Sequence, residues 1–292
     1  MIHGVQALWG KNLTTEDWGF FLVDAKKAFN EINRVGIMWK VRHLWMSVAH
    51  VVFNCYCKWS LFVLRNRNRK SSFLHSKEGV TQGCPLAMIT SRIVVLPLIK
   101  NIKWEIPNIT HTWYGDNTGA SGTFTIIETY FNFLTCQGPG RGYYPKPSKS
   151  VLFVHPVNLE TGKEFGARQV FKVCTGALYP GSYIRDGESK SDWLRERTLT
   201  CEKNINKISE TEGGYPQESY AAVVSAIQSE WIFLQHVTWD TGYVFTGSGK
   251  KIQETFLPRL FFRNTKTLSP FVGSISAMPA KKSGLGLLNP VT

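Results

Sequence analysis

A short, wholly apolar run near the start of the chain ends directly on a carboxylate. Residues Trp18–Val23 are aromatic, aliphatic and β-branched, and Asp24 follows them without an intervening polar residue. The length and composition of this run predict a buried β-strand. An acidic side chain at the end of such a strand is a candidate functional group.

A second acidic residue lies at the tip of a predicted hairpin. His111–Tyr114 and Thr118–Gly122 are predicted strands, and Gly115, Asp116 and Asn117 lie between them. These three residue types tolerate the positive φ angles that short hairpin turns require. The sequence therefore predicts Asp116 at the hairpin tip.

Asp24 and Asp116 together form a candidate site for divalent metal ions. Carboxylate oxygens are the hard ligands that Mg²⁺ prefers, and the ends of neighbouring strands can hold a metal between them. In phosphoryl transfer, such ions activate the attacking oxygen and neutralise the leaving pyrophosphate. Each residue taken alone has a plainer interpretation as a turn or capping residue.

Four blocks of sequence surround and connect these carboxylates. Val23–Asn30 contains an Asp followed by Ala and, further on, Phe-Asn, and Glu78–Ala87 contains Gln-Gly-Cys-Pro-Leu. Tyr114–Asn117 reads Tyr-Gly-Asp-Asn, and Gly142–Ser150 begins with Gly and contains two lysines. In content and order these blocks resemble the polymerase motifs of reverse transcriptases, and the likeness is closest to non-LTR-type and related eukaryotic retroelements.

The resemblance implies a role for each block. Asp24 and Asp116 would hold two Mg²⁺ ions, with Mn²⁺ as an alternative. Phe29 would lie against the sugar of the incoming nucleotide and exclude a ribose 2′-hydroxyl, although an ordinary core Phe fits its spacing equally well. Lys149 would stabilise or protonate the pyrophosphate, or else is a solvated lysine before a strand. The implied catalytic residues are Asp24, Asp116, Asn117 and Lys149, and the implied substrate-binding residues are Ala25, Phe29, Gln82, Gly83, Pro85 and Tyr114.

Two features depart from the family pattern. Asn117 stands where the family has a second Asp, which removes one negative charge beside the metals. Only 23 residues precede Asp24. We therefore expect a chain truncated at its amino end, without the fingers segment that grips template and nucleotide.

The resemblance and the order of predicted elements together imply an α+β fold. Residues 1–190 are expected to form a right-hand polymerase palm, an antiparallel sheet with helices packed on one face, with the fingers largely missing. Residues 191–292 are expected to form a mainly helical, thumb-like region. The further predicted elements are helices at 86–100, 126–134, 193–208 and 220–237, an interrupted helix from Lys27 to Trp45, strands at Cys55–Leu64 and Val151–Val154, and a basic hairpin tip at Arg65–Lys70. This region is expected to pack as a thumb against the palm through the apolar side chains of Trp193, Leu194, Trp231, Phe233 and Leu234.

The charge balance favours a nucleic-acid partner. The 292 residues include 34 Lys and Arg against 21 Asp and Glu, a net charge of +13 that attracts polyanions through counterion release. The six cysteines show neither zinc-site nor disulfide spacing, and no run approaches the roughly 18 apolar residues of a membrane helix. We expect an intracellular protein, in the nucleus or cytoplasm, that binds an RNA or DNA template with its primer and deoxynucleoside triphosphates, and no membrane. The oligomeric state is unknown from the sequence.

Three functions fit these observations. The first is a magnesium-dependent RNA-directed DNA polymerase. The second is a viral-type RNA-dependent RNA polymerase, which Phe29 argues against because those enzymes usually carry an Asp there to recognise the ribose hydroxyl. The third is a non-catalytic remnant of a mobile element that binds nucleic acid without turnover.

Overall fold

The computed structural model describes residues 2–65, 71–81, 83–115, 117–179, 182–184, 188–211, 214–238, 241–262, 269–288 and 290. The chain divides into two compact units. One comprises Leu8–Thr175, and the other combines Met1–Ala7 with Gly176–Thr292. This division lies before the boundary near residue 190 that the sequence predicts, and the assignment of the two parts to palm and thumb stays a prediction.

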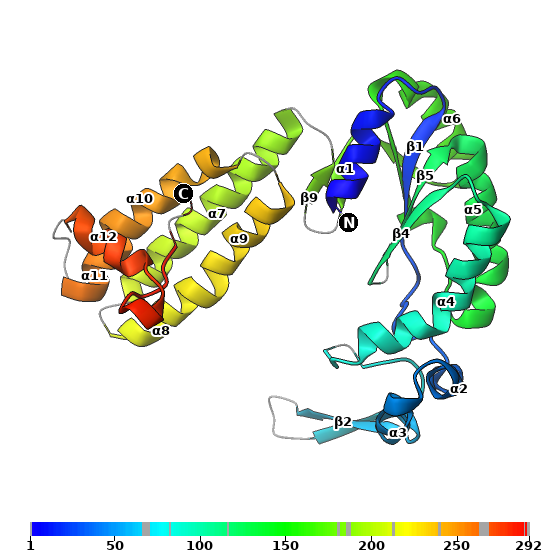
Figure 1. The fold of residues 1–292 in the computed structure, drawn as a ribbon, viewed down its shortest axis with the longest axis horizontal. Coiled ribbons are helices and arrows are strands. Elements are labelled where there is room, and N and C mark those ends of the chain that lie inside the picture. The colour runs from blue at the N-terminus through cyan, green and yellow to red at the C-terminus, as the bar shows by residue number, and fades with distance from the viewer. Residues whose placement is uncertain are drawn as a thin grey trace. The chain divides into compact units, whose positions relative to one another are not determined.

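A five-stranded sheet forms the centre of the first unit, with strand order β4-β5-β1-β6-β7 (Figure 1). The strands are β1 (Trp18–Val23), β4 (Thr110–Tyr114), β5 (Asn117–Thr123), β6 (Val151–Val154) and β7 (Lys172–Cys174). Neighbouring strands run antiparallel except β6 and β7, which are parallel. The predicted strands at Trp18–Val23 and Val151–Val154 and the predicted hairpin strands are confirmed.

Helices α4 (Ala87–Glu105), α5 (Phe124–Gln137) and α6 (Leu159–Gln169) pack on one face of this sheet (Figure 1). Phe124, Ile127, Phe131 and Leu134 recur on one side of α5 and are buried there, because this spacing follows the helical period. The Phe21 ring of β1 lies 5.6 Å from that of Phe131, edge to face. Apolar side chains between the sheet and these helices thus form the first core.

The segment between β1 and α4 contains α2 (Arg34–Leu44), α3 (Met46–Tyr56) and a hairpin of β2 (Ser60–Arg65) and β3 (Ser71–Ser76). Arg34 is only 4% exposed. Its guanidinium donates to the carbonyls of Gly79 and Ser76, both at 2.8 Å, to the Ser76 hydroxyl at 2.8 Å and to the Lys58 carbonyl at 3.3 Å. Since a buried charge is tolerated only when it is hydrogen-bonded, Arg34 is the tie between α2 and the end of the hairpin.

Two local predictions in this segment are wrong. The predicted strand Cys55–Leu64 is helical up to Tyr56, and the strand begins at Ser60. The helix expected from Lys27 begins only at Arg34, where the Asn33 side chain accepts a hydrogen bond from the Gly36 amide and caps the first turn. Arg65 and Ser71 pair at the end of the β2–β3 hairpin, and the rest of the predicted basic tip, residues 66–70, lies outside the described residues.

The second unit is largely helical, as predicted. Its long helices are α7 (Glu188–Thr211) and a run formed by α8 (Pro216–Ala222), a π-helical turn at Val223–Ile227 and α9 (Gln228–Val237). The remaining elements are β8 (Ala177–Tyr179), β9 (Ser182–Ile184), α10 (Thr246–Lys251), a second π-helical turn at Ile252–Phe256, α11 (Leu257–Phe262) and α12 (Pro270–Ala277), and α1 (Ile2–Lys11) spans both units.

The helices of the second unit enclose a core of their own. Trp231, Phe245 and Phe256 are fully buried in it. Trp231 and Leu234 are therefore buried, whereas Phe233 is 47% exposed, because it lies on the opposite side of α9. The packing of this region against the palm through these residues stays a prediction. No helix in the described ranges has the length and apolar character needed to cross a membrane.

Candidate active site

Asp24 and Asn117 lie on the same face of the sheet, at the ends of adjacent strands. Val23 pairs with Thr118 across the β1–β5 ladder. Both of these side chains point toward the helices, since Val23 is in the first core and the Thr118 hydroxyl lies 3.0 Å from the Tyr143 hydroxyl, with which it shares a hydrogen bond. Successive residues of a strand alternate between faces and cross-strand partners share one. The side chains of Asp24 and Asn117, one position further along, are therefore directed to the other face.

Lys149 lies beside Asp24, on the side of β1 where β6 pairs rather than the side where β5 pairs. Leu22 pairs with Val151 in the antiparallel β1–β6 ladder, and continuing that register by two residues brings position 149 level with Asp24. The Lys149 ammonium lies 3.6 Å from a carboxylate oxygen of Asp24. Because the lysine is 61% exposed, this ion pair contributes at most about 1 kcal/mol to stability. The ion pair matters more for the site because the Lys149 ammonium offsets the negative charge of Asp24.

The turn between β4 and β5 is two residues long. Tyr114 pairs with Asn117, and Gly115 has a φ of +58°, the left-handed conformation that such a turn demands. Asp116, the other turn residue, lies outside the described residues. Tyr114 is 54% exposed and shares the face of Asn117. The predicted hairpin is thus confirmed up to both sides of Asp116.

The residues after Asp24 run beside the fourth sequence block. Ala25 forms an isolated antiparallel bridge with Pro145, and the Lys26 amide donates to the Tyr144 carbonyl at 2.8 Å. The Ala25 side chain is 5% exposed and packs in the first core. The Ala25 methyl group is therefore enclosed in the core, and its backbone pairs with the fourth block.

Two glycines from different blocks hold the loop Phe29–Ile32 between them. A Cβ on Gly79 would lie 2.5 Å from Asn30 Cα, and one on Gly142 would lie 2.6 Å from the Glu31 carbonyl oxygen. Both glycines also have a φ of +73°. Only glycine permits this combination of close backbone approach and left-handed conformation. The second and fourth blocks are thereby packed against the end of the first block and the two residues that follow it.

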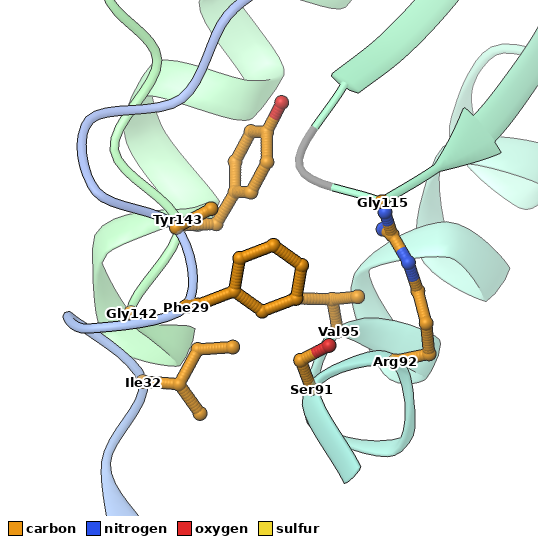
Figure 2. A pocket seen from close by; sticks show the side chains of 9 residues that line it. Phe29, Ile32, Ser91, Arg92, Val95, Gly115, Gly142 and Tyr143 are labelled. Atoms are coloured by element: carbon orange, nitrogen blue, oxygen red, sulfur yellow. The ribbon is translucent and has the colours of Figure 1, made fainter. Parts of the chain in front are cut away.

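Phe29, the first residue of this loop, lies next to the hairpin turn. Its ring lines a small cavity together with Arg92 of α4, Gly115 and Tyr143 (Figure 2). The cavity offers about 10 Å³ to the centre of a water molecule, room for about one water. Phe29 is half-buried and is therefore fixed by packing next to the turn.

The second block leads into α4. Gly83, with a φ of +88°, and Pro85 are both exposed just before the helix begins, whereas Gln82 lies outside the described residues. The Tyr56 hydroxyl donates to the Cys84 sulfur at 3.5 Å, and this hydrogen bond, with backbone amides at the helix start, lowers the pKa of the Cys84 thiol although burial opposes it. Burial, assisted by Cys84, raises the pKa of Tyr56. This contact ties the end of α3 to the second block.

The oxygen donors described at this edge of the sheet are the Asp24 carboxylate and the Asn117 side-chain amide, with the Lys149 ammonium next to them. Such oxygens fit a hard divalent cation. Within the described ranges, no group of three or more His, Cys, Asp and Glu side chains is arranged to hold a metal. Among these described side chains, the Lys149 ammonium balances the charge of the Asp24 carboxylate.

Sequence reasoning did not identify Arg92. It is the only charged residue in the stretch 87–99 of an otherwise apolar helix, and that isolation is the signal that could have identified it. Its guanidinium carbon lies 5.7 Å from the centroid of the Trp113 ring, one residue before Tyr114. The structure therefore brings a cation from α4 to the back of the hairpin turn.

Comparison with known proteins gives a fold likeness. No protein family model matches the chain, and no curated protein does. Among solved structures, telomerase from Candida tropicalis in complex with a TWJ fragment of telomeric RNA is similar, with a TM-score of 0.53 and 10% identity over 99% of this chain and 47% of that one. Telomerase from Candida albicans with the same kind of fragment has a TM-score of 0.46, at 10% identity over 96% of this chain and 52% of that one.

Apo telomerase from Candida tropicalis likewise has a TM-score of 0.46, at 12% identity over 91% of this chain and 54% of that one. The chain thus spans about half the length of these telomerase chains. Its mixed α+β fold, with a five-stranded sheet and many helices, is similar to that of telomerase.

Proposed function

We propose that this chain is the palm and thumb-like part of a reverse transcriptase, an RNA-directed DNA polymerase, from a non-LTR-type or related retroelement. It would add deoxynucleotides to a primer on an RNA or DNA template. The observation that carries the proposal is the convergence of sequence blocks: residues near 24, 79, 115 and 145, distant in sequence, pack against one another at one end of the sheet. The fold likeness to telomerase, solved with RNA, is consistent with a nucleic-acid partner.

Asp24 and Asp116 would hold the metal ions, with the Asn117 amide as a weaker oxygen donor. Two Mg²⁺ ions, or Mn²⁺, would supply activation of the primer 3′-hydroxyl and neutralisation of the leaving pyrophosphate. The shared face of Asp24 and Asn117 supports this assignment, because ligands from adjacent strands then converge.

The remaining site residues would orient the nucleotide. Lys149 would move from Asp24 to the pyrophosphate, since a flexible, exposed ammonium can exchange one anion for another. Phe29, held by packing beside the turn, would discriminate against a ribose 2′-hydroxyl. Tyr114, Gly83 and Pro85 are exposed and would contact nucleotide or template, together with Gln82 and the backbone of Ala25.

One alternative has specific support. Asn117 removes a negative charge, and Lys149 neutralises Asp24. With Asn117 in place of one of the family's carboxylates and Asp24 paired to a lysine, the site would bind divalent cations more weakly. The chain would then be a non-catalytic nucleic-acid-binding remnant, whose affinity falls steeply with salt because of its net charge of +13.

Primer extension on an RNA template with Mg²⁺ and deoxynucleotides separates these proposals. Restoring the missing carboxylate in Asn117→Asp should raise extension more than about tenfold, since each 1.4 kcal/mol of transition-state stabilisation is a factor of about ten. Asp24→Asn should abolish extension. Asn101→Asp adds the same charge at an exposed position of α4 and should change nothing. Extension at background in both the wild type and Asn117→Asp would refute the enzyme and leave the binding function.

A further inference from the structure

Arg92 occupies a position where a charged side chain is costly. It is the only charged residue in the first thirteen positions of α4, residues 87–99, and the neighbouring Val94, Val95 and Leu98 are buried. A guanidinium in such surroundings loses hydration and must be compensated by fixed partners. The position of Arg92 therefore indicates that its guanidinium is fixed by specific contacts.

Those contacts lie at the hairpin turn. The guanidinium carbon of Arg92 is 5.7 Å from the centroid of the Trp113 ring. That ring in turn lies 5.4 Å from the ring of Tyr143, whose hydroxyl shares a hydrogen bond with Thr118. Figure 2 shows the Arg92 side chain extending from α4 toward Gly115, opposite the rings of Phe29 and Tyr143. Arg92 thus contacts Trp113, two residues before Gly115, and lines the same small cavity as Gly115 itself.

Among the described strands, β4 lies at the edge of the sheet and pairs with β5 alone. The backbone at Gly115 is therefore held by one ladder and by the side chains that pack near it, Arg92 among them. A guanidinium offers five donors in a rigid plane, which suits the fixing of a turn, whereas an ammonium is a point charge on a flexible stem.

We propose that Arg92 is a positioning residue that fixes the β4–β5 turn against Phe29 and thereby sets the turn relative to Asp24. The inference rests on the proposed function, because this spacing matters only if the turn carries metal ligands. The cavity between Arg92 and Phe29 has room for about one water. Small changes at Arg92 are therefore transmitted to both the turn and the ring.

Hydrogen exchange of the intact chain tests the proposal without requiring activity. In Arg92→Gln, amides of residues 110–119 should exchange about tenfold faster, while those of α5 and α6 stay unchanged, because only the turn loses its support. Arg92→Lys should lie between Gln and wild type. Arg168→Gln is the matched control. The guanidinium carbon of Arg168, an exposed residue of α6, lies 6.0 Å from the centroid of the Phe165 ring, so the substitution removes a similar contact away from the turn.

Two outcomes would overturn the inference. Unchanged exchange at residues 110–119 would show that the turn does not depend on Arg92. Equal loosening of α5, α6 and the turn would show that Arg92 supports the unit as a whole rather than the turn. A localised effect, together with no primer extension by either the wild type or Asn117→Asp, would uphold the positioning role while refuting the polymerase function. The two failures are therefore distinguishable.

Discussion

Gly79→Ala should separate the first and second sequence blocks. A Cβ at Gly79 would lie 2.5 Å from both the Asn30 Cα and the Phe29 carbonyl oxygen, and both neighbours are backbone, which cannot rotate away. The loop would have to move, which would break the hydrogen bonds from the Val80 amide to Phe29 (2.7 Å) and from the Gly79 amide to Ile32 (2.9 Å). The substitution therefore removes the close packing of Gly79 on the loop and both backbone hydrogen bonds together.

The expected cost follows from these parts. The left-handed φ of +73° adds about 1 kcal/mol for a residue with a Cβ, and two lost backbone hydrogen bonds add about 1 kcal/mol each, for a total of about 3 kcal/mol. Gly83→Ala shares the positive φ but has open space around its Cβ, so it should cost only about 1 kcal/mol. Gly140→Ala has neither feature and should stay within about 0.5 kcal/mol of wild type.

Hydrogen exchange of the buried β1 amides reports the opening free energy of the unit Leu8–Thr175 and measures all three variants on one scale. Primer binding and extension, if present, should fall in the same order. Equal costs for Gly79→Ala and Gly83→Ala would refute the reasoning, because close approach would then contribute nothing beyond the backbone conformation.

Two further predictions concern single side chains. Burial, together with Lys103, lowers the pKa of His111, and its Nδ1 accepts a hydrogen bond from Trp113 at 3.1 Å. The His111 imidazole of the unfolded chain therefore takes up a proton more readily than that of the folded chain, so the free energy of unfolding should fall as the pH drops through about 6.5. His111→Gln should reduce that fall. Thermal midpoints of both proteins between about pH 8 and about pH 5 measure it. Arg34→Met removes four hydrogen bonds of a buried guanidinium and should cost more than about 2 kcal/mol in the exchange-derived stability of β2 and β3. Exposed Arg42→Met should cost little, and equal effects would contradict the role of Arg34.

The strand at Trp18–Val23 and the hairpin around Asp116 were predictable because their signals are local. An apolar run of strand length and a Gly-Asp-Asn turn each specify their own backbone. The position of Lys149 beside Asp24 was not predictable in the same way, because it depends on the register between β1 and β6, strands far apart in sequence. The resemblance to reverse transcriptases identified Lys149 as a site residue but did not predict its distance from Asp24.

Failures occurred where tertiary contacts override local preference. Cys55 and Tyr56 are β-compatible residues, yet they end α3, since Tyr56 packs in a core with α2 and donates to Cys84. The glycines at 79 and 142 show the same limit. Each must be glycine because the backbone of residues 29–32 comes too close for a Cβ, and that loop is distant in sequence from both glycines.

The proposed polymerase function depends most directly on Asp24 and the β4–β5 turn binding a divalent cation together. Replacing Mg²⁺ by Fe²⁺ and generating hydroxyl radicals at the bound ion cuts the backbone near its ligands. We predict two sets of cuts, one around Asp24 and one around Gly115–Asn117, both suppressed by excess Mg²⁺ and both lost in Asp24→Asn but kept in Asp192→Asn, which alters an exposed acid on α7. Cuts at only one of the two segments, or cuts that survive Asp24→Asn, would contradict a shared metal site.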